Sequence, residues 1–254
     1  MLLPLAGKPL VLYTVDRARE ARNVSRVMVA TDDPRIFEAV TASGNEAVMT
    51  SAEHQSGSDR VAEVAHDLAE GTVIVNVQGD EPFISAKTIE TAVDAMIGDR
   101  GADIVTAYER IESASEILDP NVVKVVVDET GRALYFSRGP IPFPREAVNK
   151  WGSLEIALAE DKGLLSGFKK HTGLYVYRRE YLLEFTGLTP TVLERTEMLE
   201  QLRALEHGAV IKAVRAAGRS FGVDTPDDLE RVRAIVEAEK GDARTSGVNA
   251  FCFS

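Results

Sequence analysis

The chain has 254 residues, 44% of them hydrophobic and 27% charged, which is enough apolar content for a sizeable core in one large or two small domains. Its net charge of −11 argues against general binding to nucleic acids and anionic membranes. The single cysteine, Cys252, excludes an internal disulfide framework and a Cys/His zinc site, and without an apolar run of ~20 residues or a basic leader we expect a cytoplasmic protein.

Strands and helices alternate through the first 108 residues. Four short apolar runs predict strands, at residues 26–30, 46–50, 72–77 and 104–108. Three segments with helical spacing lie between them, at residues 35–42, 58–68 and 89–97. This alternation is typical of parallel sheets, so we predict an α/β fold with a Rossmann-like, doubly wound and mostly parallel sheet.

The middle and the end of the chain follow other patterns. Residues 122–127 and 133–136 predict a hairpin around Asp128-Glu129-Thr130-Gly131, whereas residues 149–170 lack a pattern and predict a mobile loop or insert. Further strands are predicted at 173–177 and 210–214, and further helices at 179–185, 193–206 and 226–239. We expect one domain over residues 1–240 and a disordered tail over residues 241–254.

Two acidic motifs are the strongest signals for chemistry. Asn76-Val77-Gln78-Gly79-Asp80-Glu81-Pro82 ends an apolar run that predicts a buried parallel strand, and Gly222-Val223-Asp224-Thr225-Pro226 lies far along the chain. Open α/β sheets bind ligands at the carboxyl ends of their strands, and carboxylates suit Mg²⁺. The alternative is that Asp80 is a turn residue and that Asp224 belongs to a helix cap.

Eight segments in one order resemble the 3-deoxy-manno-octulosonate (Kdo) cytidylyltransferases, or CMP-Kdo synthetases. They cover roughly residues 7–232 and are Val29-Ala30-Thr31-Asp32-Asp33, His54-Gln55-Ser56-Gly57-Ser58-Asp59-Arg60, the Asn76 motif, Asn121-Val122-Val123-Lys124-Val125-Val126, Ala133-Leu134-Tyr135-Phe136-Ser137-Arg138, His171-Thr172-Gly173-Leu174-Tyr175, Glu194 to Arg203 and Gly222 to Glu230. Each segment alone is a weak signal, but eight in register are specific.

The resemblance implies a nucleotide-diphospho-sugar transferase type of fold and a cytidylyl transfer. The anomeric hydroxyl of Kdo attacks the α-phosphate of CTP in line, pyrophosphate leaves, and Mg²⁺ neutralises charge. The product is activated Kdo for lipopolysaccharide biosynthesis. The family also implies a homodimer, with approximately residues 119–190 forming the sugar-side and dimerisation subregion.

The resemblance assigns the nucleotide side of the site. It implies that Asp80 and Asp224 are the catalytic metal ligands and that Gln78 and Gly79 contact nucleotide or sugar. It also places His54, Ser56, Gly57 and Arg60 in a loop that holds cytosine and phosphates. The alternative for this loop is an ordinary capped helix start, and His54 is expected to be structural rather than catalytic.

The sugar side is assigned in the same way. At about 100° per residue, Glu194, Glu197 and Gln201 lie within about 60° of arc on one helix, and the resemblance implies that they bind Kdo hydroxyls. Arg138 and His171 are candidates for the Kdo carboxylate, and Tyr175 for the pocket wall. The alternatives are an ion-paired helix face, a core tyrosine and, for Lys124, a solvent-facing strand residue.

The start of the chain departs from the family. The family begins with a strand and a loop of the type Pro-Ala-Arg-x-x-Ser-x-Arg-Leu-Pro-Gly-Lys-Pro, followed by a second Gly-Lys-Pro, and only the second is present, as Gly7-Lys8-Pro9. Either the start lies internally or the chain is truncated. Without that strand its neighbours lack backbone partners on one side, and without that loop we expect a weak or inactive enzyme.

Three alternative functions remain open for this sequence. One is a cytidylyltransferase for a related 2-keto acid sugar, of the 8-amino Kdo or sialic acid type. Another is a truncated, non-catalytic paralogue that dimerises or binds nucleotide. The third, a Rossmann dehydrogenase, is disfavoured because no Gly-x-Gly-x-x-Gly follows an early strand.

Overall fold

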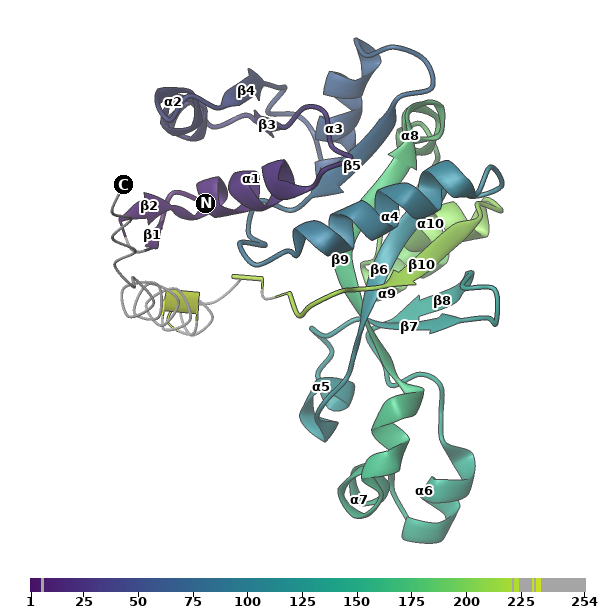
Figure 1. The fold of residues 1–254 in the computed structure, drawn as a ribbon. Helices are drawn as coiled ribbons and strands as arrows, with labels where there is room; N and C mark the ends of the chain where they lie inside the picture. The colour runs from purple at the N-terminus through teal and green to yellow at the C-terminus, as the bar shows by residue number, and fades with distance from the viewer. Residues whose placement is uncertain (6, 221, 224–229, 231, 234–254) are drawn as a thin grey trace, which may run out of the picture.

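The computed structural model describes residues 1–5, 7–220, 222–223, 230 and 232–233 (Figure 1). The predicted tail 241–254 lies outside these residues, as does most of the predicted helix 226–239. In the part that is described, no helix is both long and apolar enough to cross a membrane.

The N-terminal part contains a small parallel sheet. β1 (Pro4–Leu5) and β2 (Lys8–Pro9) form an antiparallel pair before α1 (Leu10–Glu20), a helix that the sequence did not predict. β3 (Met28–Thr31) pairs in parallel with β4 (Glu46–Met49), and α2 (Pro34–Ala42) connects the two strands. α2 begins where predicted because Asp33 caps it and Pro34 occupies its first turn.

A larger sheet forms the centre of the molecule. Its strands are β5 (Val73–Val77), β6 (Ile104–Arg110), β7 (Lys124–Val127), β8 (Ala133–Ser137), β9 (Lys169–Arg178) and β10 (Ile211–Arg215). β9 runs antiparallel to β5, β6 and β7, while β10 is parallel to β6. The α/β class is confirmed, but the sheet is mixed, and the described partner of β5 is antiparallel. β5, β6 and β10 still point the same way, so their carboxyl ends share one edge.

Both faces of this sheet are covered because apolar side chains alternate along its strands. Val105 and Val176 lie in a core with α4 (Ala86–Gly98). Ile104 and Tyr177 lie in the opposite core, with α3 (Gly57–His66), α8 (Arg179–Thr186) and α10 (Gln201–Glu206). This period of two is the expected signature of a strand buried on both faces.

The two sheets remain separate. Among the described residues, β3 pairs with β4 and not with β5, and β5 pairs with β9 alone. Among the described residues, β3 and β5 therefore each have one edge without a backbone ladder. In Figure 1, α1 lies between the β3–β4 pair and the helix α4.

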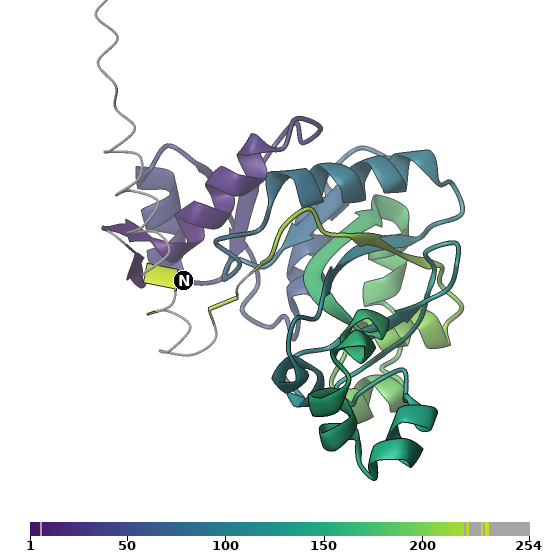
Figure 2. The same ribbon diagram turned by 60° about the horizontal axis from the view of Figure 1, so that its bottom comes forward.

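The predicted loop at residues 149–170 is instead largely helical. It contains the end of α6 (Arg145–Trp151), all of α7 (Leu154–Glu160) and a 3-10 helix, Lys162–Gly167. Leu158 and Phe168 pack with Ile111 and with Ile117 of α5 (Ala114–Leu118) in a small core of their own. These helices are too short to show an apolar period. Figures 1 and 2 show α5, α6 and α7 projecting beyond the end of the sheet.

The predicted helix 193–206 is broken into two. α9 (Val192–Glu197) ends at Met198, whose φ of 52° is left-handed, and α10 follows from Gln201. A left-handed residue reverses the helical path, so side chains before and after Met198 do not share one helical face.

Candidate active site

The carboxyl ends of β5, β6 and β10 bring three segments together. Asp80 and Glu81 follow β5, Glu109 lies near the end of β6, and residues 216–220 and 222–223, here called the strap, follow β10. The strap begins with a hydrogen bond from Ala216 N to Tyr108 O at 2.8 Å and reaches Val223, whose N–H donates to Asp80 O at 3.0 Å. Asp224 lies outside the described residues, one peptide bond beyond Val223.

Two carboxylates hold the strap at Ser220, that of buried Glu109 and that of half-buried Glu81. The Ser220 backbone N–H donates to Glu109 Oε1 at 2.7 Å, and the Ser220 hydroxyl donates to the Glu81 carboxylate. Burial raises the pKa of Glu81 to about 6, the Ser220 hydrogen bond opposes this shift, and the nearby Asp80 charge adds to it. Burial also raises the pKa of Glu109. Glu109 and Ser220 were not predicted; a lone acid ending an apolar strand was the available signal for Glu109.

Gln78 lies between two segments that are remote in sequence. A Cβ built on Gly57 would lie 3.7 Å from Gln78 Nε2, and one built on Gly173 would lie 3.7 Å from Gln78 Cγ. Gln78 and Gly57, each predicted separately as a site residue, therefore lie close together. Gly79 also permits a close approach, but of a side chain: a Cβ there would lie 2.7 Å from Met1 Cε.

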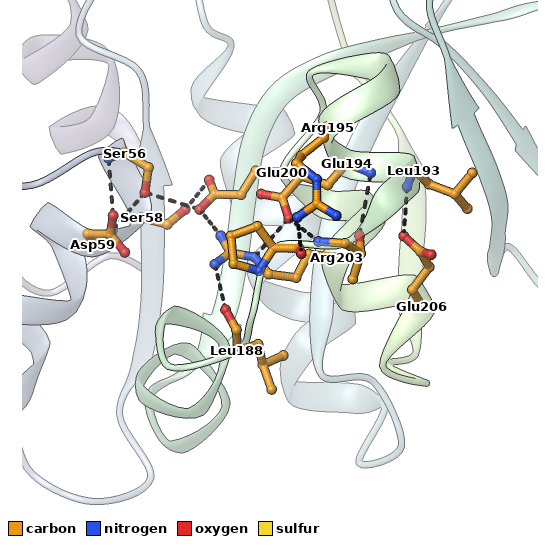
Figure 3. Close-up of polar contacts among 12 residues, drawn as sticks. Ser56, Ser58, Asp59, Leu188, Leu193, Glu194, Arg195, Glu200, Arg203 and Glu206 are labelled. Carbon is orange, nitrogen blue, oxygen red and sulfur yellow. Dashed lines mark hydrogen bonds and ion pairs between the residues drawn. The ribbon is translucent and has the colours of Figure 1, made fainter.

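Ser56 starts α3 and connects it to the opposite segment of the site (Figure 3). Its hydroxyl accepts a hydrogen bond from Asp59 N, and the Asp59 carboxylate accepts one from Ser56 N. Together the two bonds form a capping box. Glu200 accepts from Ser56 Oγ at 3.1 Å and from Ser58 Oγ at 2.9 Å, and pairs with Arg203 Nη2 at 2.7 Å. The predicted nucleotide loop thus contacts the predicted sugar-side segment through Glu200, which the sequence reasoning did not select.

The other two loop residues have structural partners. His54 Nε2 binds the Glu63 carboxylate, in keeping with the structural role expected for it. Arg60 donates to Thr50 Oγ1 at 2.5 Å and pairs with Asp32 at 3.2 Å, so its charge already faces an acid of the Thr31-Asp32-Asp33 motif.

The predicted sugar-side aromatic residues lie on β9. His171 Nε2 is 2.8 Å from Thr106 Oγ1, and the His171 ring lies edge-on to Phe136, with centroids 4.9 Å apart. Burial lowers the pKa of His171 to about 3, so the imidazole is neutral and contributes no positive charge. Tyr175 is 5.4 Å from His171 and stacks on Tyr177 at 6.0 Å.

The three polar residues assigned to one helix face do not share it, because Met198 breaks the helix. Glu194 closes the capping box of α9 and lies 3.4 Å from Arg203 Nε. Glu197 accepts from Ser137 Oγ and Arg138 N at 2.7 and 2.9 Å. Gln201 is 5% exposed, and its buried Nε2 has no hydrogen-bond partner among the residues that the structure describes.

Arg138 and Lys124 are both engaged with backbone carbonyls. The Arg138 guanidinium donates to Glu197 O at 2.7 Å, Pro120 O at 3.0 Å and Met198 O at 3.3 Å. The alternative of a solvent-facing Lys124 was wrong: the side chain is fully buried, and its ammonium donates to Asp119 O, Val122 O and Arg138 O. Burial lowers the Lys124 pKa.

No metal cluster marks the site from the described residues alone. No group of three His, Cys, Asp or Glu that could hold a metal occurs among them, and Asp224 is outside that search. A hollow of about 600 Å³ lies elsewhere, and Gln78, Asp80 and Glu81 do not line it. Its lining residues are His54, Asp59, Ala62, Glu63, His66, Asp67, Leu183 and Thr186.

Known proteins resemble this chain over most of its length. The sequence model described as "Cytidylyltransferase" matches residues 1–217. The 3-deoxy-manno-octulosonate cytidylyltransferase of Geobacter sulfurreducens is 48% identical over 234 residues, covering 91% of this chain and 90% of that relative. Its counterpart in Geotalea daltonii is 49% identical over 231 residues, covering 91% and 89%. A solved CMP:2-keto-3-deoxy-manno-octonic acid synthetase complexed with CTP has a TM-score of 0.82 and 40% identity, covering 94% of this chain and 91% of that one.

Proposed function

This chain belongs to the cytidylyltransferase family, and from that premise we infer that it transfers CMP from CTP to the anomeric hydroxyl of Kdo and releases pyrophosphate. The product is activated Kdo for lipopolysaccharide biosynthesis. The observation that carries this inference is similarity to enzymes of this activity along nearly the whole chain. An in-line displacement of this kind needs no covalent enzyme intermediate, so the protein contributes positioning and charge neutralisation.

We propose that Asp80 and Asp224 hold a Mg²⁺ ion. Carboxylate oxygens are suitable ligands for this metal. Asp80 lies at the shared carboxyl edge of β5, β6 and β10, and the hydrogen bond from Val223 N to Asp80 O holds Val223, the residue before Asp224, at that edge. A bound Mg²⁺ would neutralise charge on the triphosphate. Glu81, whose pKa burial raises to about 6, is half-buried beside Asp80 and bonded to Ser220, which favours a supporting role for it.

We propose that the segment from Ser56 to Arg60 and the amide of Gln78 hold the nucleotide. Gly57 leaves room beside the Gln78 amide, and the first amides of α3 favour negative groups. Asp32 pairs with Arg60 from the other side and orients its guanidinium. Glu200 keeps the Ser56 hydroxyl donating outward from the helix, so the turn is fixed before CTP arrives.

On the sugar side, the geometry favours His171, Tyr175 and Gln201 over the other candidates. The buried Nε2 of Gln201 has no hydrogen-bond partner within the described part of the chain, and His171 is a neutral hydrogen-bonding group. Glu194, Glu197 and Arg138 already bond within the chain, so we propose that they shape the sugar pocket by holding α9 and β8 together.

The decisive measurement is pyrophosphate release from CTP and Kdo with Mg²⁺, together with CTP binding by calorimetry. We expect turnover that needs both substrates. Turnover with an 8-amino Kdo or sialic acid in preference to Kdo would assign the chain to a related sugar. CTP binding without turnover on any of these sugars would favour a non-catalytic paralogue.

The metal assignment has its own test. Asp80→Asn should lower kcat by about a hundredfold or more, because loss of a group that stabilises transition-state charge typically costs that much. Asp94→Asn is a matched control, because Asp94 is an exposed acid of α4 that accepts from Asn23. Equal kcat values for the two variants would contradict a role for Asp80 in catalysis.

Two further proposals concern assembly and compartment. We propose a homodimer that uses the segment with α6 and α7, where Phe143 and Ile156 expose 60% and 49% of their surface. Sedimentation of the chain and of Ile156→Glu would test it, since a monomer in both cases contradicts the proposal. We also propose a cytoplasmic enzyme, because CTP is a cytoplasmic nucleotide.

A further inference from the structure

Arg203 is a buried cation to which the reaction described above gives no role. Only 6% of its surface is exposed, and its Cζ lies 4.5 Å from the centroid of the Phe185 ring. Nη1 donates to Leu188 O at 3.1 Å and Nη2 to Glu200 Oε1 at 2.7 Å, while Nε lies 3.4 Å from Glu194 Oε2. Burying a charge carries a large desolvation penalty, so these contacts must offset it.

Glu200 connects this arginine to the start of α3 (Figure 3). Its Oε1 accepts from Arg203 Nη2 and Ser56 Oγ, and its Oε2 accepts from Ser58 Oγ. Burial raises the pKa of Glu200, and the Ser58 hydrogen bond and the Arg203 charge oppose that shift. A hydrogen bond between two ionised groups is shorter and stronger than a neutral one. Arg203 is therefore the partner that fixes the orientation of this half-buried carboxylate.

The Glu200 carboxylate lies between the two sides of the proposed site. Ser56 is the N-cap of α3 and begins the segment proposed to hold the nucleotide. Gln201, proposed for the sugar, follows Glu200 directly and is the first residue of α10, which also contains Arg203. Two hydrogen bonds thus lead from Arg203 through Glu200 to the first turn of α3. A different orientation of Glu200 would shift that turn relative to Gln201.

We propose that Arg203 is a positioning residue for both substrates: by fixing the Glu200 carboxylate, it holds the nucleotide side of the site in register with the sugar side. This rests on the proposed roles of the Ser56 segment and of Gln201. Arg203 touches neither substrate and acts through Glu200. Its contacts with Phe185 and Leu188 anchor the guanidinium at the end of α8, which packs against α3 in the same core.

The test is a double-mutant cycle between Arg203 and Glu200, with CTP and Kdo as the substrates. Arg203→Met should raise KM for CTP and KM for Kdo about tenfold, while kcat changes less than about twofold, because no reacting atom is touched. In the double variant with Glu200→Gln, KM for CTP should stay within about threefold of that in Glu200→Gln alone. A residue that acts through Glu200 has no further effect once that carboxylate is gone.

Arg195→Met is the matched control. Arg195 is an exposed arginine of the neighbouring helix α9, and its guanidinium donates to Pro190 O at 2.7 Å. Both KM values of this variant should stay within about twofold of the parent chain. Arg203→Lys keeps a charge for Glu200 and should lie between the parent chain and Arg203→Met. It takes the place of Arg203→Met in the cycle if the methionine variant does not fold.

Hydrogen exchange of the full chain gives a second readout that needs no turnover. Asp59 N donates to Ser56 Oγ at 3.1 Å, so exchange at the Asp59 amide should become about tenfold faster in Arg203→Met. Peptides covering β6 should exchange as in the parent chain. Exchange that rises equally in β6 would overturn the proposal, because the arginine would then only stabilise the fold.

Three kinetic results would also overturn it. One is unchanged KM values in Arg203→Met, and another is a rise confined to KM for Kdo. The third is a double variant whose KM for CTP lies about a hundredfold above that of the parent chain, since multiplied effects mean that Arg203 and Glu200 act independently. If the parent chain shows no turnover, the proposed function fails, while exchange at Asp59 still decides whether Arg203 holds the start of α3.

Discussion

The buried imidazole of His171 makes the stability of this protein depend on pH in a defined direction. The folded protein keeps His171 neutral, with a pKa of about 3 instead of 6.5, because burial disfavours the charged form. The unfolded chain binds a proton at this residue once the pH falls below about 6.5. Acid therefore favours the unfolded state, and the contribution of His171 to stability is lost as pH falls from 6.5 toward 3.

The size of the effect follows from the two pKa values. Between pH 6.5 and pH 3 the free energy of unfolding should fall by about 1.4 kcal/mol per pH unit through this residue. From pH 7 to pH 5 the loss is about 2 kcal/mol, because the first part of the interval lies above the unfolded pKa. His171→Gln removes this term and keeps a side chain that can reach Thr106 Oγ1.

The assay is urea unfolding at pH 7, 6 and 5, followed by far-ultraviolet circular dichroism. The stability of the parent chain relative to His171→Gln should fall by about 2 kcal/mol over this range. His66→Gln is the control, since the His66 side chain is 78% exposed. Parallel stability curves for the parent chain and His171→Gln would refute the reasoning, because they would mean that folding does not change proton binding at His171.

Three other changes test features of the fold and the site. Met198→Gly should raise the free energy of unfolding by about 0.5–1 kcal/mol and Tm by about 1–2 °C. The reason is that Met198 has a left-handed φ and its side chain is 75% exposed and packs little. A lower Tm on a thermal scan would contradict this. Lys124→Met should cost about 3 kcal/mol in urea unfolding, because three buried carbonyl oxygens lose their donor; a change below 1 kcal/mol would show that the carbonyls find other partners. Glu200→Gln should raise KM for CTP about tenfold, since Ser56 and Ser58 both donate to that carboxylate; an effect confined to KM for Kdo would place Glu200 on the sugar side alone.

Helices and strands could be predicted from the sequence wherever burial of one face gives the apolar residues a regular spacing. β6 and β9 alternate between two cores, and α2 and α3 carry capping residues, so their existence was predictable. The antiparallel direction of β9 was not, because periodicity is the same in either direction. α7 was missed because it is one short helix whose cap, Ser153, stands in an unpatterned segment.

The site was predictable only where chemistry is local. The Gly-Asp-Glu motif was predicted to follow a strand and does so, and Gly57 lies beside Gln78, another residue predicted for the site. The break at Met198 could not be foreseen, since methionine gives no signal for a left-handed conformation, and it invalidated the helical-face argument for Gln201. Whether a charge such as Lys124 is buried depends on carbonyl groups contributed by other segments, which no local pattern encodes.

The open edges of β3 and β5 have a consequence for how the molecule unfolds. Among the described residues, no backbone ladder joins the β3–β4 pair to the larger sheet, and the polar links across this boundary include those of Arg60 to Asp32 and Thr50. Proteins open locally in cooperative units that often coincide with supersecondary motifs, and the β3–α2–β4 segment is such a motif. We therefore expect the amides of β3 and β4 to exchange through an opening of lower free energy than those of β6 and β9. We expect the bonds of Arg60, which lies in the proposed nucleotide loop, to couple the opening of the two units.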